Sequence, residues 1–442
     1  MSIKVCKFGG TSMADAKAMT SAKEIILADP SRKFVVVSAP GKRFKTDIKV
    51  TDLLYACYDE VLQKGNCKQA FLPVRERFKE IVSDLSLELD IDSILDETEK
   101  GINENSETSD FAASRGEYLS ARVMAAYLGF PFVDAAEIIR FDSQGRFNAS
   151  YSDDKMKTKL CGLSCAVIPG FYGKNSFGKI KTFSRGGSDI TGSIVASGVE
   201  ADLYENWTDV SGFMVCDPRI VENAKIIKYV TYRELRELSY MGASVLHAEA
   251  IFPVMKKRIS INIKNTFNPN DAGTMIVPTE KYSNIDNTII TGIAGKKDFT
   301  VIYIEKSMMN AEIGFIRKVL SIVEHHGICV EHLPSGVDTL SVVIASENLK
   351  NGILSDIVNE IRETVSPDYV HVTENVSLVA TVGHGMTRKA GTAAKIFSAI
   401  ARENINIVMI DQGSSELNII VGVANSDYEK CIKTIYNEFM AD

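Results

Sequence analysis

The sequence lacks the segments that mark a membrane protein or a secreted protein. It has no run of about 18 apolar residues, which is the length that a membrane-spanning helix needs. Its first residues, MSIKV, lead straight into a strand-like run, without the apolar core and small-residue cleavage site of a signal peptide. We therefore expect a cytoplasmic protein with no membrane partner.

Clustered metal ligands are also lacking. The eight cysteines are scattered and form no CxxC pair, and no grouped histidines accompany Cys161 and Cys165, which are the closest two. A structural zinc site needs that ligand spacing, and disulfide frameworks belong mainly to oxidising compartments. We expect free thiols and no metal bound by the protein itself.

Excess positive charge is missing as well. The chain has 50 Lys and Arg against 57 Asp and Glu, a net charge of −7, with both signs spread along it. Nucleic acids and anionic membranes are bound by basic surfaces, so neither is expected as a main partner. What the chain does have is 45% hydrophobic residues over 442 positions, enough for two or three domains of roughly 100–200 residues each.

Residues 1–265 alternate strand-like and helix-like segments. Continuous apolar runs such as FVVVSA at residues 34–39 are typical of a parallel sheet buried on both faces. Strands that alternate with helices indicate a β-α-β architecture, whose ligands bind at the C-terminal ends of the strands. The expected strands are residues 3–8, 34–39, 166–169 and 201–206, and the expected helices are residues 14–28 and 109–128.

An internal repeat follows the turn-rich residues 266–273. Residues 314–343 and 391–420 share glycines, a lysine, a serine and an apolar pattern at corresponding positions, and each copy predicts a strand–helix–strand–turn–strand unit. Two copies indicate a paired module, because a solenoid needs about three or more repeats. Chance similarity between two ordinary helix–strand units is the alternative.

Two segments contain the paired glycines expected of anion-binding loops. The first, KFGGTS at residues 7–12, follows a strand and opens a helix, where free N–H groups and the helix dipole favour phosphate. Lys7 adds a cation at the end of the strand. The GxxxxGK[ST] spacing of a Walker A loop is absent, and a plain tight connection is the alternative.

The second segment is TFSRGGSD at residues 182–189, which also precedes a helix. Arg185 can form two parallel hydrogen bonds to a carboxylate or a phosphate. For Ser188 or Asp189 alone, a simple N-cap is an equally good interpretation. Two such loops in one α/β unit suit a molecule with two anionic ligands.

Two further positions are unusual for their surroundings. The first is WTDVSG at residues 207–212, which is followed by DPR at residues 217–219. It lies just beyond a strand, where ligands of α/β sheets bind. A turn-rich connection with Asp209 in an Asx turn is the alternative. Glu117 stands beside Arg115 and Gly116 in an otherwise apolar helix. It is either a solvated charge or the partner of a substrate ammonium group.

Five motifs, taken in order, resemble those of the aspartate kinases of the amino acid kinase superfamily. They are KFGGTS, SRGE at residues 114–117, FSRGGSD, WTDV-x-G with DPR, and GASVLH at residues 242–247. TDLL at residues 51–54, after Ser38, resembles their substrate loop, and the repeat resembles their tandem ACT domains. The resemblance implies an α/β/α sandwich with a mainly parallel sheet at residues 1–285. It implies α+β ferredoxin-like ACT domains at residues 286–442, with ACT1 at about 299–370. ACT2 is implied at about 376–442 plus strand 288–294, because the first ACT unit is nested within the second.

The resemblance also implies roles for individual residues. Lys7 would neutralise the transferring phosphate, and Asp189 would orient active-site donors. Glu117 would face the ammonium group of aspartate, and Arg185 a carboxylate. The implied aspartate-binding residues are Ser38, Thr51, Glu117, Arg185 and Ser188, and the implied ATP-binding residues are Lys7, Gly9, Gly10, Ser12, Thr208, Asp209, Gly212 and Arg219.

Two departures from the family pattern affect this assignment. The loop APGKRFKTDIKV between Ser38 and Thr51 is longer than in some members, so Thr46 competes with Thr51 for the substrate hydroxyl; the TDLL context favours Thr51. Phe267 stands where some members have a lysine that helps to bind ATP, and Lys264 is the candidate to replace it.

The implied chemistry suits these residue types. A free aspartate side chain, with a pKa of about 3.9, is already ionised at neutral pH, so no general base is needed. The difficulty is to bring an anion up to a polyanion, which cations, glycine N–H groups and Mg²⁺ overcome. We expect L-aspartate and ATP as substrates, with Mg²⁺ carried by ATP, in the first step of lysine, threonine and methionine biosynthesis.

The repeat implies regulation by an amino acid. Lysine is the first choice of effector, alone or with threonine, and a homodimer formed through the ACT domains, or a tetramer, is expected. ACT units that only dimerise are the alternative. Positions that match the effector pocket of the family are Met308, Glu312, Gly314, Phe315, Val330, Glu331, Ser335 and Gly336.

Two rival functions remain open at this point. One is a kinase of the same superfamily that acts on glutamate, acetylglutamate, carbamate or a nucleotide; the SRGE segment and the ACT repeat disfavour it. The other is a non-catalytic amino-acid sensor, which the intact Lys7, Arg185 and Asp209 disfavour.

Overall fold

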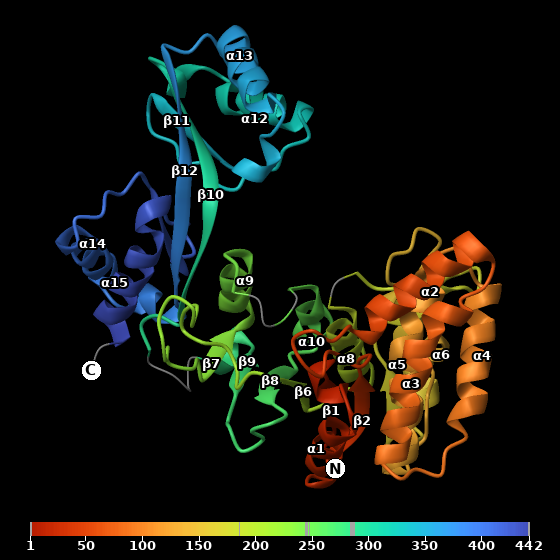
Figure 1. The fold of residues 1–442 in the computed structure, drawn as a ribbon. Coiled ribbons are helices and arrows are strands. Elements are labelled where there is room, and N and C mark those ends of the chain that lie inside the picture. The colour runs from red at the N-terminus through yellow and green to blue at the C-terminus, as the bar shows by residue number, and fades with distance from the viewer. Residues whose placement is uncertain (1, 185, 244–245, 247, 283–287, 441–442) are drawn as a thin grey trace. The chain divides into compact units, whose positions relative to one another are not determined.

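The computed structural model describes residues 2–184, 186–243, 246, 248–282 and 288–440 (Figure 1). The chain forms two units. Residues 1–213, 226–232 and 245–286 make the first unit, and residues 214–225, 233–244 and 287–442 make the second. Two short segments that lie before residue 285 in the sequence therefore group with the C-terminal unit. Among the described residues, every helix is too short or too polar to cross a lipid bilayer.

The sheet of the first unit contains seven strands within the described residues, in the order β3-β2-β1-β6-β8-β9-β7. The first five of these strands are parallel to their neighbours, and β9 runs antiparallel to β8. The predicted mainly parallel sheet is confirmed. The strands are β1 (Lys4–Phe8), β2 (Arg32–Val37), β3 (Ala166–Pro169), β6 (Leu203–Thr208), β7 (Tyr229–Thr231), β8 (Ser260–Asn265) and β9 (Thr274–Val277).

Side chains alternate between the two faces of this sheet, as the strand period requires. Cys6, Phe8 and Trp207 belong to a core shared with the helices of one face. Those helices are α1 (Ala16–Leu27), α2 (Val50–Lys64), α3 (Lys68–Asp84), α4 (Ile91–Glu104) and α5 (Asp110–Leu128). Lys7 and Asn206 point to the opposite face, covered by α8 (Gly187–Gly198). Helices on both faces confirm the predicted sandwich.

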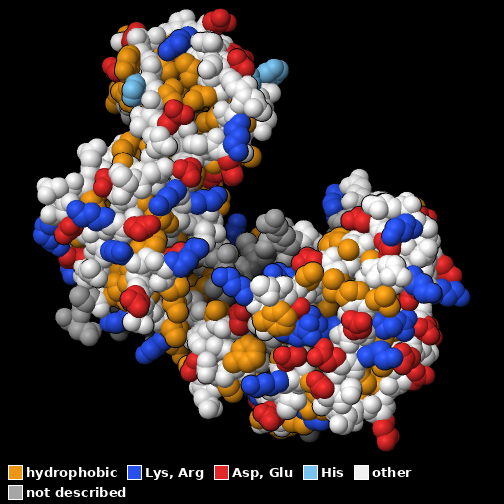
Figure 2. Space-filling view, in the orientation of Figure 1, with side chains coloured by type: hydrophobic (Ala, Val, Ile, Leu, Met, Phe, Trp, Pro, Cys, Tyr) orange, Lys and Arg blue, Asp and Glu red, His pale blue; other side chains and the backbone are white. Residues whose placement is uncertain are grey.

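Smaller elements complete the first unit. A hairpin of β4 (Tyr172–Lys174) and β5 (Ile180–Thr182) leads from β3 towards α8. The short helices are η1 (Thr11–Met13), α6 (Ala135–Ile138), α7 (Ala149–Leu160), η2 (Ala248–Ile251), α10 (Phe252–Lys256) and α11 (Thr279–Tyr282). On the visible surface of this unit, Lys and Arg are interspersed with Asp and Glu, as the spread of charge along the sequence predicts (Figure 2).

The second unit is built on an antiparallel sheet with the strand order β11-β10-β12-β14-β13 in its described residues. Strands β10 (Gly292–Glu305) and β12 (Tyr369–Val382) are 14 residues long and run through both halves of the unit (Figure 1). Midway, Asp298 and Asn375 have φ of 68° and 59°, and the register shifts there. Gly292 pairs with Val382, so the first part of β10 lies beside the end of β12 in the second half of the sheet.

Each half packs two helices on its part of the sheet. The half with β11 (Thr339–Ala345) has α12 (Phe315–His325) and α13 (Ile353–Val365) around one apolar core. The other half has β13 (Met409–Asp411), β14 (Asn418–Ala424), α14 (Thr392–Arg402) and α15 (Tyr428–Met440). The helix α9 (Tyr232–Tyr240) follows β7 directly, and its carboxylate Glu234 accepts hydrogen bonds from Thr291 and from the His384 N–H.

Candidate active site

Lys7 and Asp189 meet where β1 and the first turn of α8 come together. Lys7 Nζ lies 2.5 Å from Asp189 Oδ1, and the two side chains are only 9% and 15% exposed. Asn206 on the neighbouring strand donates to the same carboxylate oxygen at 3.0 Å, and the Tyr204 hydroxyl donates to the Asp189 carbonyl at 3.1 Å. Charges fixed in a poorly solvated place act strongly on a charged ligand.

The glycine loop after β1 is held by its neighbours. The Gly9 N–H donates to the Trp207 carbonyl at 2.9 Å, so this N–H is already used inside the protein. The Gly10 carbonyl accepts from the Gly41 N–H at 2.8 Å. Ser12 is buried, and its hydroxyl lies 2.7 Å from the Thr266 hydroxyl. A Cβ on Gly41 would lie 2.7 Å from the Gly10 carbonyl carbon, so close approach of two loops explains these glycines.

Glu117 is the buried acid of the site. Its side chain lies inside α5 at 5% exposure of the residue, accepts from the Ala39 N–H, and lies 3.5 Å from the Ser188 hydroxyl. Among the described residues, its Oε2 atom has no hydrogen-bond partner. Burial raises the pKa of Glu117 to about 8, against the opposing effects of these hydrogen bonds and of Lys7. A buried acid with an unpaired oxygen can receive a cationic ligand.

Glycines, which have no side chain, let two other segments of the site approach Glu117. A Cβ on Gly116 would lie 2.6 Å from the Ala39 Cβ, so glycine lets α5 approach the segment after β2. A Cβ on Gly170 would lie 2.7 Å from the Ser188 Cβ, so β3 approaches α8 in the same way. Ser188 therefore lies close to Glu117, and Ala39, the residue after Ser38, packs on the helix of Glu117.

The two candidate threonines of the longer loop differ in position. Thr51 is half-buried in the first turn of α2, whose Val50 N–H donates to the Pro40 carbonyl at 3.1 Å, whereas Thr46 is exposed. Arg185, predicted to bind a carboxylate, lies outside the described residues.

The predicted nucleotide residues fall into two groups. Asp209 accepts from the Thr11 hydroxyl at 3.1 Å and from the Thr208 hydroxyl at 3.2 Å, which joins the end of β6 to the glycine loop. Gly212 has φ of 112°, which favours glycine, and a Cβ there would lie 2.4 Å from Thr274 Oγ1. Arg219 belongs to the second unit, where its side chain is 88% exposed and pairs with Asp217 at 2.6 Å.

Lys264 and Phe267 lie near the end of β8. The Lys264 ammonium lies 5.1 Å from the centre of the Trp207 ring, and burial lowers its pKa. Phe267 is 48% exposed. Lys264 therefore places a positive charge beside Trp207, near the C-terminal end of β6.

Three features of this part of the structure were not predicted from the sequence. Asn206 could have been noticed as a polar residue inside a buried strand. Phe171 has φ of 77° in the turn that reaches α8, and no sequence signal predicts this. Arg77 on α3 is 4% exposed and binds Asp47 at 2.7 Å, in a region to which the sequence analysis assigned no helix.

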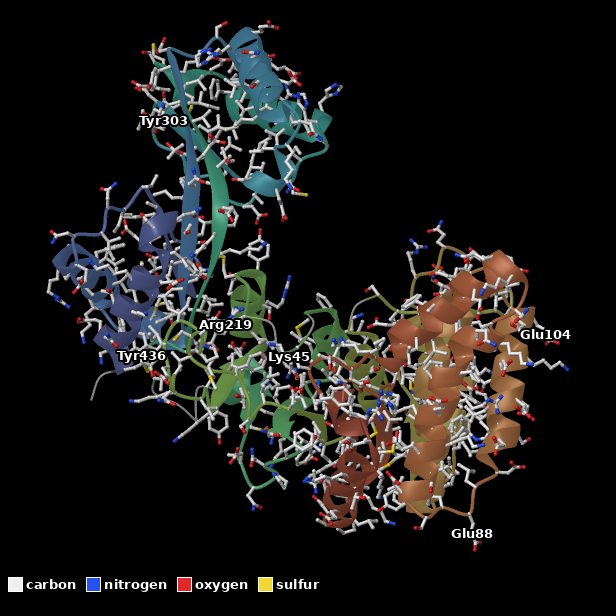
Figure 3. The ribbon with its side chains drawn as sticks, viewed as in Figure 1. Lys45, Glu88, Glu104, Arg219, Tyr303 and Tyr436 are labelled. Carbon is white, nitrogen blue, oxygen red and sulfur yellow. The ribbon has the colours of Figure 1, made fainter. Side chains whose placement is uncertain are left out.

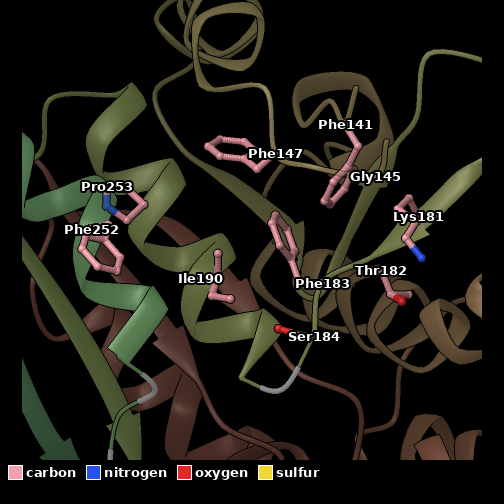
Figure 4. A pocket seen from close by; sticks show the side chains of 10 residues that line it. All are labelled: Phe141, Gly145, Phe147, Lys181, Thr182, Phe183, Ser184, Ile190, Phe252 and Pro253. Atoms are coloured by element: carbon pink, nitrogen blue, oxygen red, sulfur yellow. The ribbon is translucent and has the colours of Figure 1, made fainter. Parts of the chain in front are cut away.

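A cavity of about 530 Å³ lies beside the second glycine segment (Figure 4). The Phe183 ring centre lies 4.8 Å from that of Phe141 and 6.0 Å from that of Phe147, so the wall is largely aromatic. Ser184 and Ile190 also line it, whereas the predicted substrate and nucleotide residues that the structure describes do not. The cavity adjoins the second glycine segment through Ser184.

The positions predicted to bind an effector lie in the half of the second unit that contains α12. Glu312 pairs with Lys306 at 2.6 Å and with Lys318 at 2.8 Å, and Glu331 accepts from the Tyr240 hydroxyl. Phe315 is 2% exposed in the core, so only its backbone can face a ligand. Met308 is 72% exposed, and Gly314 has φ of 78° just before α12. Val330 packs on the core of this half. Ser335 pairs with Leu340, and the Gly336 N–H donates to the Thr339 carbonyl.

Comparisons with known proteins agree with this architecture. The amino acid kinase family matches residues 2–265, and an ACT domain matches residues 379–439. The chain is 39% identical to Aspartokinase 3 of Bacillus subtilis (strain 168) over 455 aligned positions, covering 99% of each protein. It is 28% identical to the chloroplastic Aspartokinase 1 of Arabidopsis thaliana, covering 98% of this chain and 80% of that protein.

Solved structures give the same result. The aspartate kinase of Clostridium acetobutylicum superposes with a TM-score of 0.90 at 52% identity, covering 99% of this chain and all of that one. E. coli aspartokinase III, solved in complex with aspartate and ADP, superposes with a TM-score of 0.73 at 24% identity over 99% of both chains, a likeness of fold.

Proposed function

This chain belongs to the aspartate kinases, which are enzymes of the amino acid kinase family that phosphorylate aspartate and carry ACT domains, and we propose how its own residues serve that reaction. The γ-phosphoryl group of ATP is transferred to the side-chain carboxylate of L-aspartate, giving 4-phospho-L-aspartate. This is the first step of lysine, threonine and methionine biosynthesis. Residues 1–285 are the proposed catalytic domain. The proposed ACT domains are residues of about 299–370 for the first, and about 376–442 plus strand 288–294 for the second.

The observation that carries the proposal is the convergence of Lys7, Asp189 and Glu117. A lysine fixed by a carboxylate at 2.5 Å lies close enough to a buried acid to influence its pKa. Ser188, the residue before Asp189, lies 3.5 Å from Glu117, so the ammonium group and the buried carboxyl group both adjoin the first turn of α8. They can hold a phosphate at one end and the amino group of a substrate at the other.

The phosphate end is assigned to the loop after β1. Lys7 neutralises the transferring phosphoryl group, and Asp189 and Asn206 hold its ammonium in place. The Gly9 N–H is not available for phosphate, because it donates to the Trp207 carbonyl. The donors to phosphate are therefore assigned to Gly10 and Ser12 at the start of η1. The first N–H groups of a helix have no partner within the helix. Thr208, Asp209 and Gly212 are the proposed contacts to the rest of ATP, and Lys264 is proposed to take the place of the lysine that some members have at position 267.

The aspartate end is assigned to residues from four segments. Glu117 binds the ammonium group, and Arg185 and Ser188 bind a carboxylate. Ser38 and Thr51 supply hydroxyls from the loop after β2 and from α2. Thr51 is chosen over Thr46 because it is half-buried beside the Pro40 contact.

The reaction needs positioning more than acid–base chemistry. The attacking carboxylate is ionised at neutral pH, so no residue has to remove a proton from it. Lys7 and the loop donors offset the negative charge of the two reactants as they approach. Mg²⁺ bound to ATP supplies further positive charge, and the carboxylates of Asp189 and Asp209 are oxygen donors of the kind this ion prefers.

Regulation is assigned to the α12 half of the second unit. Lysine is the proposed effector, with threonine the second choice, and Glu331 is the proposed partner of its ammonium group. Burial raises the pKa of Glu331, and its hydrogen bond from Tyr240 can be exchanged for one from a ligand. The remaining contacts are assigned to Met308, Glu312, Gly314, Phe315 through its backbone, Val330, Ser335 and Gly336.

A homodimer through the ACT domains is proposed, with a tetramer as the larger alternative. Ile313, Met308 and Val337 are 96%, 72% and 67% exposed, and association would remove these apolar side chains from water. A cytoplasmic location is proposed because all eight cysteines are free, as is usual in a reducing compartment.

One assay tests the function. The purified protein is incubated with ATP, Mg²⁺ and either aspartate, glutamate or acetylglutamate, and both ADP and the acyl phosphate are measured, with and without lysine or threonine. Aspartate-dependent formation of both products, inhibited by lysine, is the expected result. Turnover with glutamate or acetylglutamate in preference to aspartate would contradict the substrate assignment.

A further inference from the structure

The segment Gly41–Lys49, here called the basic loop, joins the substrate segment after β2 to α2. It contains Lys42, Arg43, Lys45 and Lys49 against a single carboxylate, Asp47. Its three lysines are exposed (Figure 3 labels Lys45), and none forms an ion pair with a described residue. The loop is therefore a local concentration of positive charge on a chain whose net charge is −7.

A buried arginine from another element holds this loop. Arg77 on α3 donates through Nη2 to both oxygens of Asp47, at 2.7 and 2.9 Å. Through Nη1 it donates to the Gly41 carbonyl at 3.3 Å and to the Ala14 carbonyl at 3.4 Å. Gly41 begins the basic loop, and Ala14 ends the short helix that follows the glycine loop. One guanidinium thus joins the basic loop to the glycine loop.

Direct contact between the two loops agrees with this arrangement. The Gly41 N–H donates to the Gly10 carbonyl at 2.8 Å, and there is no room for a Cβ on Gly41. Lys42, the next residue, therefore starts beside the backbone of Gly10. Any change that frees the basic loop also frees the back of the glycine loop.

The electrostatics of the Arg77–Asp47 pair favour a positioning role. Burial and the nearby charge of Arg43 lower the pKa of Arg77. Against the effect of burial, hydrogen bonds from Arg43 and the charge of Arg77 hold the pKa of Asp47 well below its usual range. A buried ion pair adds little net stability, but removal of one partner leaves an uncompensated charge. The pair therefore fixes geometry more than it stabilises the fold.

We propose that Arg77 is a positioning residue that clamps the basic loop against the glycine loop, so that the lysines of the loop draw the two anionic reactants to the phosphate end of the site. This inference rests on the proposed phosphoryl transfer, because it assigns a task to residues that surround that reaction. Electrostatic attraction of this kind raises the rate of capture and is weakened by salt.

The first test compares Arg77→Met with Arg75→Met. Arg75 lies on the same helix and also forms ion pairs, with Asp92, Asp96 and Glu99, but it contacts neither loop through them. Arg77→Met should raise the KM for ATP and for aspartate about tenfold and lower kcat, whereas Arg75→Met should keep all three values. Equal kinetics in the two variants, with only a lower unfolding temperature, would overturn the proposal.

A milder variant keeps the test valid if Arg77→Met fails to fold. Asp47→Asn retains the shape of the side chain and loses the charge, and it should raise both KM values in the same direction. The single variant Arg77→Lys completes a cycle with Asp47→Asn, and the double variant should be no worse than the more affected of these two, since the two residues act as one clamp. Fully additive losses would show that they act separately.

The lysines are tested against a charge-matched control. Replacement of Lys42, Lys45 and Lys49 by Gln should lower kcat/KM about fivefold at low ionic strength and should flatten its dependence on salt. Replacement of the exposed Lys68, Lys100 and Lys157 by Gln changes the net charge equally and should have neither effect. Identical behaviour of the two triple variants would refute the electrostatic part. A wild-type protein that forms no aspartyl phosphate would instead contradict the proposed function.

Discussion

The candidate active site in the first unit and the candidate effector site in the second differ in how far their charged side chains are buried. In the first unit, Lys7, Glu117 and Arg77 are almost fully buried and are fixed by partners from other elements. In the second, Glu312 is 27% exposed, and its partners Lys306 and Lys318 are 22% and 36% exposed. Buried charges act strongly because they need no rearrangement when a reactant arrives. Charges near water exchange partners at little cost in free energy, which suits a regulatory site.

The largest effect should come from the buried cation. Lys7→Ala should reduce kcat about 1,000-fold, because the charge that faces the transferring phosphate is lost from a poorly solvated place. The matched control is Lys4→Ala on the same strand, where Lys4 pairs with Asp29 at 2.8 Å away from the site. Steady-state kinetics of both variants measure this, and a Lys7→Ala enzyme with normal turnover would contradict the assignment.

The buried acid should affect binding more than turnover. Glu117→Gln keeps the shape but cannot become ionised when the ammonium group binds, so the KM for aspartate should rise about 100-fold, equivalent to about 2.7 kcal/mol. The KM for ATP should change little and kcat only a few-fold. Equal increases in both KM values would show that Glu117 supports the fold instead of holding the amino group.

The pKa of Glu117 predicts a dependence on pH. Below its pKa of about 8 the free enzyme holds this acid protonated, so the KM for aspartate should fall about tenfold per unit as pH rises towards 8. The native state binds this proton and the unfolded state does not between pH about 4.5 and 8, so stability should fall as pH rises through that range. Bound aspartate should reduce that fall. A KM for aspartate that does not change between pH 6 and 8 would contradict this prediction.

The smallest effect is expected in the regulatory unit. Glu331→Gln should raise the lysine concentration for half-inhibition about tenfold, because a charged hydrogen bond to the effector is weakened. Glu363→Gln, on the exposed face of α13 in the same half of the unit, is the control and should leave inhibition unchanged. Calorimetric titration with lysine gives the affinity directly. Unchanged affinity in Glu331→Gln would move the effector site elsewhere.

The sequence was informative where chemistry requires unusual residues at fixed spacing. The glycine segments at residues 7–12 and 182–189 and the charged Glu117 in an apolar helix were recognisable because local patterns seldom place such residues without a reason. Their convergence could be expected only in outline, from the rule that ligands bind at the carboxyl ends of parallel strands. The assignment of the strand-like residues 288–294 to the second ACT unit came only from the family resemblance and stays a prediction.

Only the tertiary structure showed which residues fix the site. Asn206 orients Asp189, and Arg77 joins two loops, although neither belongs to a glycine segment. Helices α3 and α4 were not assigned from the sequence, so the position of Arg77 could not be expected. The core position of Phe315 was equally invisible, because whether an apolar residue packs inward or faces a ligand depends on the sheet beneath it.

By itself, the amino-acid sequence determined the fold class and the residue types that can bind anions, because both follow from hydrophobic period and local backbone geometry. The tertiary structure decided which N–H groups remain available, which acid is buried enough to stay protonated, and which arginine holds the basic loop. Those properties depend on partners from distant segments, since solvation and hydrogen bonding are set by what surrounds a group in space.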